Sequence, residues 1–298
     1  MSAPDRRKGL LLMIGAGLCW SLGGLIVRSV EVADPWTIVF WRALFMGLFV
    51  GVVLVAMHGR AAGVQVRGVG AAGLIAAICL ALQIYFFILS LKNTTTANTF
   101  VLMSVSPLVT AVAGWLFLGE RVHAATWAAI AVALAGILVM FGEGLVAAGA
   151  PSHWIGNLFA LCVPLAYATQ ILFVRRIRAP GVAAPNLLPT ILLAGIVAAV
   201  PALFLASTLA VSPRDLALLA LMGCVQLGLG CLLMTLAVPH LRAAEMGLLA
   251  MIETILAPLW VWIGVGESPG ATALAGGALI LGALFVNGWI ALRAEPRA

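Results

Sequence analysis

The chain alternates between long apolar stretches and short polar gaps. Ten stretches are about as long as the ~20 residues that an α-helix needs to cross the ~30 Å hydrocarbon core of a bilayer. Helices are expected because a helix satisfies its backbone N–H and C=O groups within one segment, which lipid cannot do. The sequence shows no short alternating strands of the kind that build a membrane β-barrel. The predicted spans are Leu10–Val27, Trp36–Met57, Gly70–Leu89, Thr96–Leu118, Ala124–Met140, Trp154–Val174, Leu187–Ser207, Leu216–Val238, Ala243–Val265 and Ala271–Leu292.

The composition points the same way. Of the 298 residues, 64% are hydrophobic and only 9% are charged, and the mean hydropathy is +1.18. A soluble domain needs a polar exterior, which this composition cannot supply. The predicted fold class is therefore an all-α integral membrane protein with ten transmembrane helices. The five cysteines lie inside spans and lack the CxxC spacing of zinc or redox sites, so no metal and no cofactor is expected.

The basic residues collect in alternate gaps between the spans and so predict the orientation. With the N-terminus in the cytoplasm, 12 of the 16 Lys and Arg residues are cytoplasmic, three are outside and Arg42 lies within a span. This split follows the positive-inside rule and predicts a multi-pass protein of the bacterial inner membrane with both termini cytoplasmic. The net charge of +6 then anchors the chain to anionic lipid, and no nucleic-acid partner is expected. The cytoplasmic residues are Arg6, Arg7, Lys8, Arg60, Arg67, Arg121, Arg175, Arg176, Arg178, Arg242, Arg293 and Arg297, and the outer residues are Arg28, Lys92 and Arg214.

The chain repeats itself with an offset of 147 residues. The strongest match is between two Trp-x-x-x-Gly-Glu segments that end at Glu120 and Glu267, because charged residues are scarce here. The offset also carries Arg28 onto Arg175. We therefore predict two repeats of five helices each, residues 1–147 and 148–298.

Five spans per repeat is an odd number, so the second repeat is inverted relative to the first. Inverted repeats are typical of secondary transporters, which bind their substrate near the bilayer midplane where the repeats meet. We therefore expect a central cavity between the two repeats. The sequence contains no P-loop, so a gradient or facilitated diffusion is expected to drive transport.

Several short motifs resemble the EamA branch of the drug/metabolite transporter superfamily over essentially the whole chain. They are Gly17-Leu18-Cys19-Trp20-Ser21, Phe40-Trp41-Arg42, Ser106-Pro107 with Leu118-Gly119-Glu120, and Ile252-Glu253-Thr254 with Val265-Gly266-Glu267. The resemblance implies ten helices, two inverted five-helix repeats and export of small metabolites. The aromatic content of the spans is most similar to that of the bacterial aromatic amino acid exporters. Thr254 stands where the family usually has proline, which weakens any argument for a gating kink there.

Polar residues in the middle of a span are costly and usually face a cavity or a partner helix. Glu253 lies ten residues past Ala243, which places it ~15 Å along its helix, near the midplane. Two roles remain open, a substrate-amine or proton-coupling carboxylate and a structural carboxylate bonded to a neighbouring helix. The repeat offset pairs Glu253 with Ser106, so the two are expected to meet near the pseudo-two-fold axis.

Three further charged residues are assigned structural or coupling roles. Arg42 either binds a substrate carboxylate or pairs with a helix-end carbonyl or a glutamate, and the structural role is favoured because the family pattern has an arginine there whatever the substrate. Glu120 and Glu267 close Gly-Glu turns and are expected mainly to cap the N-terminus of the next helix.

The remaining candidates are aromatic or uncharged polar residues that we expect to line the cavity. Trp20 and Tyr167 are equivalent under the repeat and lie away from the interfacial belts where Trp and Tyr normally collect. Gln83 and Phe87 share one helix face. The predicted substrate-binding residues are Trp20, Ser21, Trp41, Gln83, Phe87, Asn98, Ser106, Tyr167, Gln170, Gln226, Glu253 and Thr254.

Together these features predict a transporter that exports amino acids with aromatic or bulky apolar side chains by alternating access. The alternative is proton-coupled efflux of lipophilic cations, with Glu253 as the exchanged carboxylate. The expected partners are a small-molecule substrate, the lipid bilayer and, in the alternative, protons. An enzyme is not expected, because the four histidines lie far apart in loops and no HExxH or paired-Asp motif occurs.

Overall fold

The computed structural model describes residues 5–146, 153–177, 187–241 and 243–294. These residues form helices and no strand, and ten of the helices are long and apolar enough to cross a membrane, which confirms the predicted all-α membrane fold. The elements are α1 (Arg6–Ser29), α2 (Pro35–His58), η1 (Gly59–Ala61), α3 (Ala62–Arg67), α4 (Gly70–Asn93), α5 (Thr96–Met103), α6 (Ser106–Leu118), α7 (Ala124–Val146), α8 (Trp154–Ile177), α9 (Leu187–Leu205), α10 (Pro213–Leu221), η2 (Met222–Leu229), α11 (Gly230–Ala237), α12 (Ala243–Val265) and α13 (Ala271–Ala294).

The predicted fourth span is not one helix, because it is interrupted between α5 and α6. Pro107 lies in the first turn of α6. Proline has no backbone N–H to donate, and its ring clashes with the preceding turn of a continuous helix. The Ser106 hydroxyl donates to the Met103 carbonyl over 2.6 Å, so this carbonyl keeps a partner where the helix is interrupted. The equivalent helix of the second half, α12, is continuous through Thr254 and contains Pro258.

The predicted eighth span also differs from a regular α-helix. It runs from Pro213 to Ala237, and its middle part, η2, is a π-helix of eight residues. A π-helix has a wider turn than an α-helix and is found frequently at functional sites. The π-helical turns therefore change the direction of the side chains in the middle of this span.

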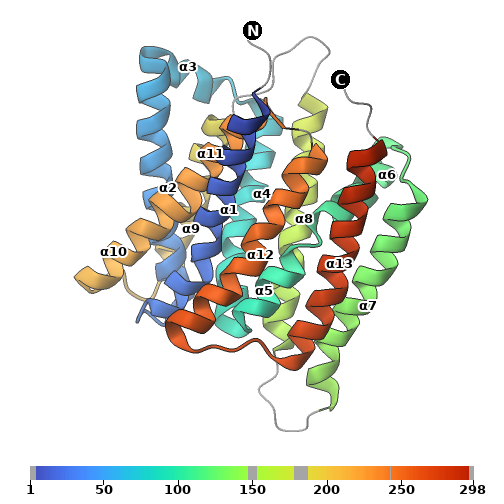
Figure 1. Cartoon of the computed structure of the whole chain (residues 1–298). Helices are drawn as coiled ribbons and strands as arrows, with labels where there is room; N and C mark the ends of the chain where they lie inside the picture. The colour runs from blue at the N-terminus through green and yellow to red at the C-terminus, as the bar shows by residue number, and fades with distance from the viewer. Residues whose placement is uncertain (1–4, 147–152, 178–186, 242, 295–298) are drawn as a thin grey trace.

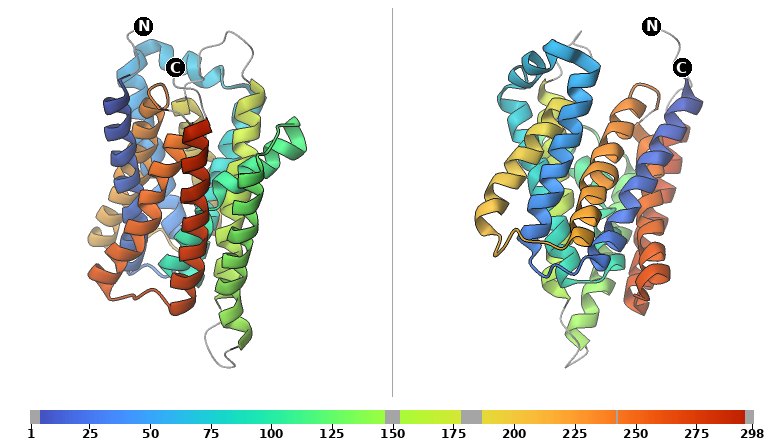
Figure 2. Two further views of the ribbon diagram at one scale, coloured as in Figure 1. Left: turned by 45° about the vertical axis from the view of Figure 1, so that its right-hand side comes forward. Right: turned by 90° about the vertical axis from the view of Figure 1, so that its left-hand side faces the viewer.

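The helices pack in pairs that join the two halves of the chain (Figure 1). α2 packs on α9, α4 on α8, α1 on η2, α11 and α12, and α8 on α5 and α6. α7 and α13 run side by side at one edge of the molecule (Figures 1 and 2). A Cβ atom built on Gly276 of α13 would lie 2.6 Å from the Gly136 carbonyl oxygen of α7, so the absence of side chains permits this close crossing.

The chain starts and finishes its helices at the same end of the bundle. The first turn of α1 and the last turn of α13 lie together at the top of Figure 1, whereas α7 ends and α8 begins at the bottom. The predicted boundary at residues 147 and 148 lies outside the described residues, as do Arg178, Arg242 and Arg297 and the side chains of Arg175 and Arg176. The inverted relation of the two halves and the central cavity stay predictions.

Candidate substrate-binding site

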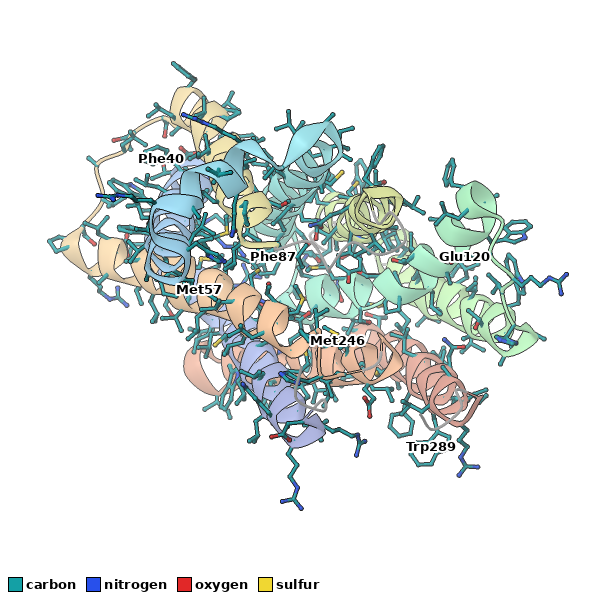
Figure 3. The ribbon with its side chains drawn as sticks, turned by 90° about the horizontal axis from the view of Figure 1, so that it is seen from above. Phe40, Met57, Phe87, Glu120, Met246 and Trp289 are labelled. Carbon is teal, nitrogen blue, oxygen red and sulfur yellow. The ribbon has the colours of Figure 1, made fainter. Side chains whose placement is uncertain are left out.

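Four predicted site residues from four different spans come together in the interior of the molecule. Arg42 of α2 donates from NH2 to the Gln226 Oε1 of η2 over 3.2 Å. Its guanidinium carbon lies 4.8 Å from the ring centroid of Phe87 in α4, and Gln226 Nε2 donates to the Trp20 carbonyl of α1 over 3.3 Å. We call Arg42, Gln226, Phe87 and Trp20 the Arg42 cluster. Figure 3 shows Phe87 near the middle of the molecule, viewed along the bundle.

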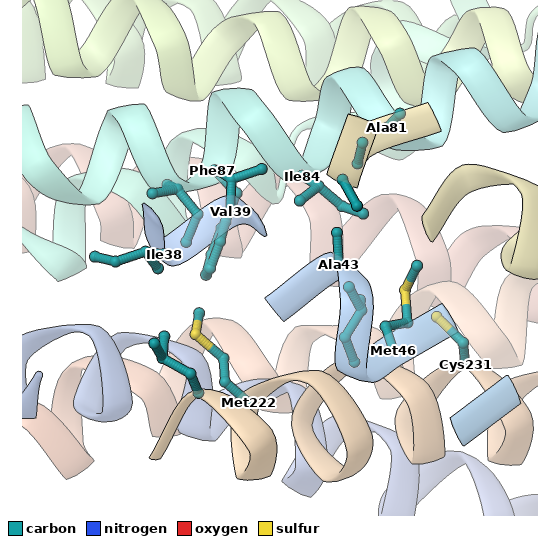
Figure 4. Packing of buried hydrophobic residues seen from close by; sticks show 14 of the residues in the cluster. Ile38, Val39, Ala43, Met46, Ala81, Ile84, Phe87, Met222 and Cys231 are labelled. Carbon is teal, nitrogen blue, oxygen red and sulfur yellow. The ribbon is translucent and has the colours of Figure 1, made fainter. Parts of the chain in front are cut away.

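The Arg42 guanidinium is deeply buried and incompletely bonded. The residue is 3% exposed, and its Nε and NH1 have no hydrogen-bond partner among the described residues. The surroundings are mostly apolar, with Val39, Ala43 and Met46 of α2 packed into the same core (Figure 4). A buried charged group normally has a paired charge and a full set of hydrogen bonds. The predicted structural pairing of Arg42 with a glutamate or a helix-end carbonyl is therefore not found in the described part of the chain, where its one hydrogen-bond acceptor is the amide of Gln226.

Glycines in and beside the π-helix hold the Arg42 cluster together. A Cβ atom on Gly223 would lie 2.6 Å from the Arg42 carbonyl oxygen, and one on Gly230 would meet the indole of Trp20. Only glycine therefore allows η2 and the start of α11 to approach α2 and α1 so closely. This approach brings Gln226 within reach of both Arg42 and Trp20.

Glu253 faces the interior from α12. At 100° per residue, its side chain lies opposite the exposed Ile255 and Trp262. Glu253 is half-buried, and no hydrogen bond or ion pair involves it in the described part of the chain. The predicted meeting with Ser106 is not supported by a hydrogen bond between them among the described residues, since the Ser106 hydroxyl donates to its own segment.

Trp260 is a further candidate site residue, which the sequence pattern did not single out. It lies two turns beyond Glu253 on the same face of α12, and its Nε1 donates to the Ser21 hydroxyl over 3.0 Å. Ser21 is fully buried and donates in turn to the Leu18 carbonyl. The seven-residue spacing from Glu253 could have identified Trp260. Thr254, the next residue after Glu253, is also buried.

The candidates Gln83, Gln170 and Asn98 form hydrogen bonds that connect the halves away from the Arg42 cluster. Gln83 of α4 donates to Gln170 Oε1 of α8 over 2.7 Å. Asn98 donates from its side-chain amide to the Thr94 hydroxyl, which donates to Asn157 of α8. These bonds satisfy buried amide groups between neighbouring helices.

Trp41 lies outside these bonded groups. The Trp41 indole donates to the Leu209 carbonyl in the connection between α9 and α10 and stacks on Phe45. Trp41 therefore faces away from the Arg42 cluster, although it precedes Arg42 in the chain. Tyr167 is half-buried in α8.

Glu267 caps a helix other than the one predicted. Its carboxylate accepts from the Thr96 N–H at the start of α5 over 2.6 Å and lies 2.6 Å from Arg28 Nε. Arg28 donates to the carbonyls of Leu91 and Thr94 at the end of α4. The negative charge thus lies at a helix N-terminus and the positive charge at a helix C-terminus, which suits both helix dipoles. Glu120 is exposed at the edge of the molecule, in the connection between α6 and α7 (Figure 3).

The described residues contain no group of three His, Cys, Asp or Glu side chains that could hold a metal ion. What the site does offer is one guanidinium, one carboxylate, several amides and aromatic rings at membrane depth. Such a set suits reversible binding of a small polar molecule with an apolar part.

Comparison with known proteins agrees with this picture. Residues 7–142 match the EamA-like transporter family. The pseudopaline exporters CntI of Pseudomonas aeruginosa strains UCBPP-PA14 and PAO1 are each 25% identical to this chain over 280 residues, covering 92% of this chain and 94% of theirs. A crystal structure of a protein with no stated function has the same fold, with a TM-score of 0.68 and 19% identity over 98% of this chain and 100% of its own. These matches and the ten apolar helices agree with the resemblance of this chain to EamA-type transporters of the drug/metabolite transporter superfamily.

Proposed function

We propose that this transporter exports small metabolites from the cytoplasm, and that its preferred substrates are amino acids with aromatic or bulky apolar side chains. The whole-length similarity to proteins named as exporters supports export of a small metabolite. The preference for an amino acid is supported by the residues of the site.

The observation that carries the proposal is the interior face of α12. Glu253 has no partner among the described residues and can accept hydrogen bonds from a substrate ammonium group at the midplane. Trp260 on the same face gives an aromatic surface on which an apolar side chain can stack. A single carboxylate beside a large ring suits an amine that carries an apolar group.

Alternating access would follow from a rocking of one half of the chain against the other. The packing supports this mechanism, because α2 with α9 and α7 with α13 are contacts between equivalent spans of the two halves. Such contacts can act as the surfaces across which the halves move.

The proposal is tested by transport into proteoliposomes that hold the purified protein. We expect counterflow of phenylalanine, tyrosine or tryptophan, and we expect Glu253→Gln to reduce this flux about 10- to 100-fold, because it removes a charge-assisted hydrogen bond to the substrate amine. The matched control is Glu31→Gln, which removes an exposed carboxylate that pairs with Arg214 far from the site. Flux of some other solute without flux of any aromatic amino acid would contradict the substrate assignment.

Proton-coupled efflux of lipophilic cations is the second candidate, and the unpaired carboxylate of Glu253 is the observation in its favour. Under this alternative, Glu253→Gln abolishes all cation transport, and the wild-type protein shows a steep dependence on pH. Unaltered amino acid flux in Glu253→Gln would instead remove Glu253 from the mechanism.

A further inference from the structure

We infer that Arg42 is the residue that recognises a carboxylate on the substrate, and that Gln226 positions it. The transporter would then select zwitterionic or anionic molecules and reject simple amines. This inference rests on the proposed function, since it assigns the second charge of an amino acid to a residue of the same site. It assigns to Arg42 the binding role that the sequence left open beside a structural one.

The first step of the argument is the unfilled hydrogen-bonding capacity of Arg42. The guanidinium carries five N–H donors and no acceptor, and one of them reaches Gln226. Nε and NH1 have no acceptor among the described residues, although Arg42 is almost completely buried. A buried cation with free donors is costly on its own, and a bound carboxylate is the group that best satisfies it.

The second step is the neutral character of the neighbours. No carboxylate in the described part of the chain forms an ion pair with Arg42, and its close contacts are a neutral amide and the face of the Phe87 ring. These contacts orient the guanidinium without neutralising its charge. The charge therefore stays available for a ligand.

The third step is the way in which Gln226 is held. Its Nε2 donates to the Trp20 carbonyl, which directs its Oε1 toward Arg42. The π-helical geometry of η2 and the missing side chain at Gly223 bring Gln226 to this point. A non-standard helical turn that aims one amide at one guanidinium is the kind of local irregularity found at functional sites.

The fourth step is the position of Arg42 relative to Glu253. Both residues lie within electrostatic range of Cys231, at the start of α11. The basic and the acidic side chain are thus near a common neighbour, while no ion pair joins them in the described part of the chain. This arrangement is complementary to a zwitterion, whose carboxylate and ammonium groups each need a partner.

The test compares two ligands that differ only in the carboxylate. The purified protein is titrated with L-phenylalanine and with L-phenylalaninamide, which keeps the amine and the ring. A third titration uses tetraphenylphosphonium as a lipophilic cation. We expect the wild-type protein to bind phenylalanine at least about 10-fold more tightly than the amide, because a charged hydrogen bond is lost with the amide. Arg42→Gln should weaken phenylalanine binding about 10- to 100-fold and leave amide binding unchanged.

Two further variants distinguish a loss of recognition from a loss of folding. Gln226→Glu places a carboxylate next to Arg42, so we expect a more stable protein that has lost its preference for phenylalanine over the amide. Arg214→Gln makes the same change of charge at an exposed ion pair and should behave as the wild type. If Gln226→Glu raised stability and left the preference intact, Arg42 would have a structural role alone.

The outcomes also separate this inference from the proposed function. Equal wild-type affinity for phenylalanine and its amide overturns the inference and leaves amino acid export standing. Equal losses of phenylalanine and amide binding in Arg42→Gln overturn it as well. Binding of tetraphenylphosphonium without phenylalanine overturns both.

Discussion

Two charged residues at the start of α2 illustrate opposite ways of placing a charge near lipid. Asp34, directly before the helix, accepts four hydrogen bonds, from the Trp36 N–H, the Thr37 hydroxyl, and the N–H and hydroxyl of Ser207. Arg42, two turns later and at membrane depth, has one hydrogen bond within the described part of the chain. A fully satisfied charge at a helix end stabilises the fold, whereas a largely unsatisfied charge in the interior stabilises whatever binds to it.

The bonds to Asp34 predict a loss of stability in acid. Burial raises the pKa of this carboxyl, but hydrogen bonds from Ser207, Thr37 and Trp36 favour the ionised form more strongly and hold the pKa below its ordinary value. A lowered pKa in the folded state gives stability that is present above the unfolded pKa of about 3.9 and is lost as the pH falls through the folded value. The connection between α9 and α10 is then released from α2.

Asp34→Asn is the variant that checks this prediction. Asparagine caps a helix about as well as aspartate but does not titrate, so the variant should lack the part of the acid-induced loss that comes from Asp34. The measurement is the midpoint temperature of thermal unfolding in detergent, taken for the wild type and the variant between about pH 3 and pH 7. The difference between the two midpoints is then compared across this pH range. A difference that stays constant over this range would contradict the assignment.

At the scale of elements, the hydrophobic pattern predicted where each span lies but not its internal geometry. Runs of apolar residues define length, so the boundaries of α2, α4 and α13 follow from them. The π-helix of η2 packs closely on α2 and α1, and its apolar run has the same pattern that a regular α-helix would have. The Ser106-Pro107 pair did carry a local signal for the interruption between α5 and α6.

For the candidate site too, the sequence indicated some features and not others. Arg42, Gln226 and Trp20 could each be named from sequence, because polar residues and Trp are unusual in the middle of a span. Phe87 could be named because it shares a helix face with Gln83. That these four meet depends on which of ten helices are neighbours, and no local pattern holds that information. The missing partner of Arg42 likewise became visible only when its surroundings were known.

The close contact at Gly223 predicts that η2 cannot accept a side chain there. In Gly223→Ala the new methyl group would overlap the Arg42 carbonyl and the Met46 N–H, so α2 and η2 must separate. We expect a loss of about 1–3 kcal/mol in the free energy of unfolding, as for other overpacked interiors. Substrate binding should weaken as well, because Gln226 moves away from Arg42.

Gly282→Ala is the matched control for this prediction. Gly282 lies within α13, and a Cβ atom there would meet nothing within 4 Å. Alanine favours a helix over glycine by about 0.8–1 kcal/mol, so this variant should be as stable as the wild type or more stable. Equal thermal stability of the two variants would show that the contact at Gly223 can relax.

At the scale of the whole molecule, the main contacts between helices recur when the two halves are exchanged. With a shift of five spans, the contact of α4 with α8 becomes the contact of α1 with η2 and α11, and both are present. The contact of α1 with α12 becomes that of α8 with α5 and α6, which is also present. The contacts of α2 with α9 and of α7 with α13 map onto themselves. This pattern is what a two-fold relation between the halves requires.

The predicted inversion is tested by the topology of the chain in the membrane. If each half crosses five times, both termini lie on one face and the connection between α7 and α8 lies on the other, which agrees with the ends of the bundle in Figure 1. A fluorescent protein that folds only in the cytoplasm should therefore fluoresce when fused after Ala294 and should not fluoresce when fused after Val146. Alkaline phosphatase, which is active only outside, should give the reverse pattern. Termini on opposite faces would exclude five crossings in each half and, with them, the alternating movement of two inverted repeats.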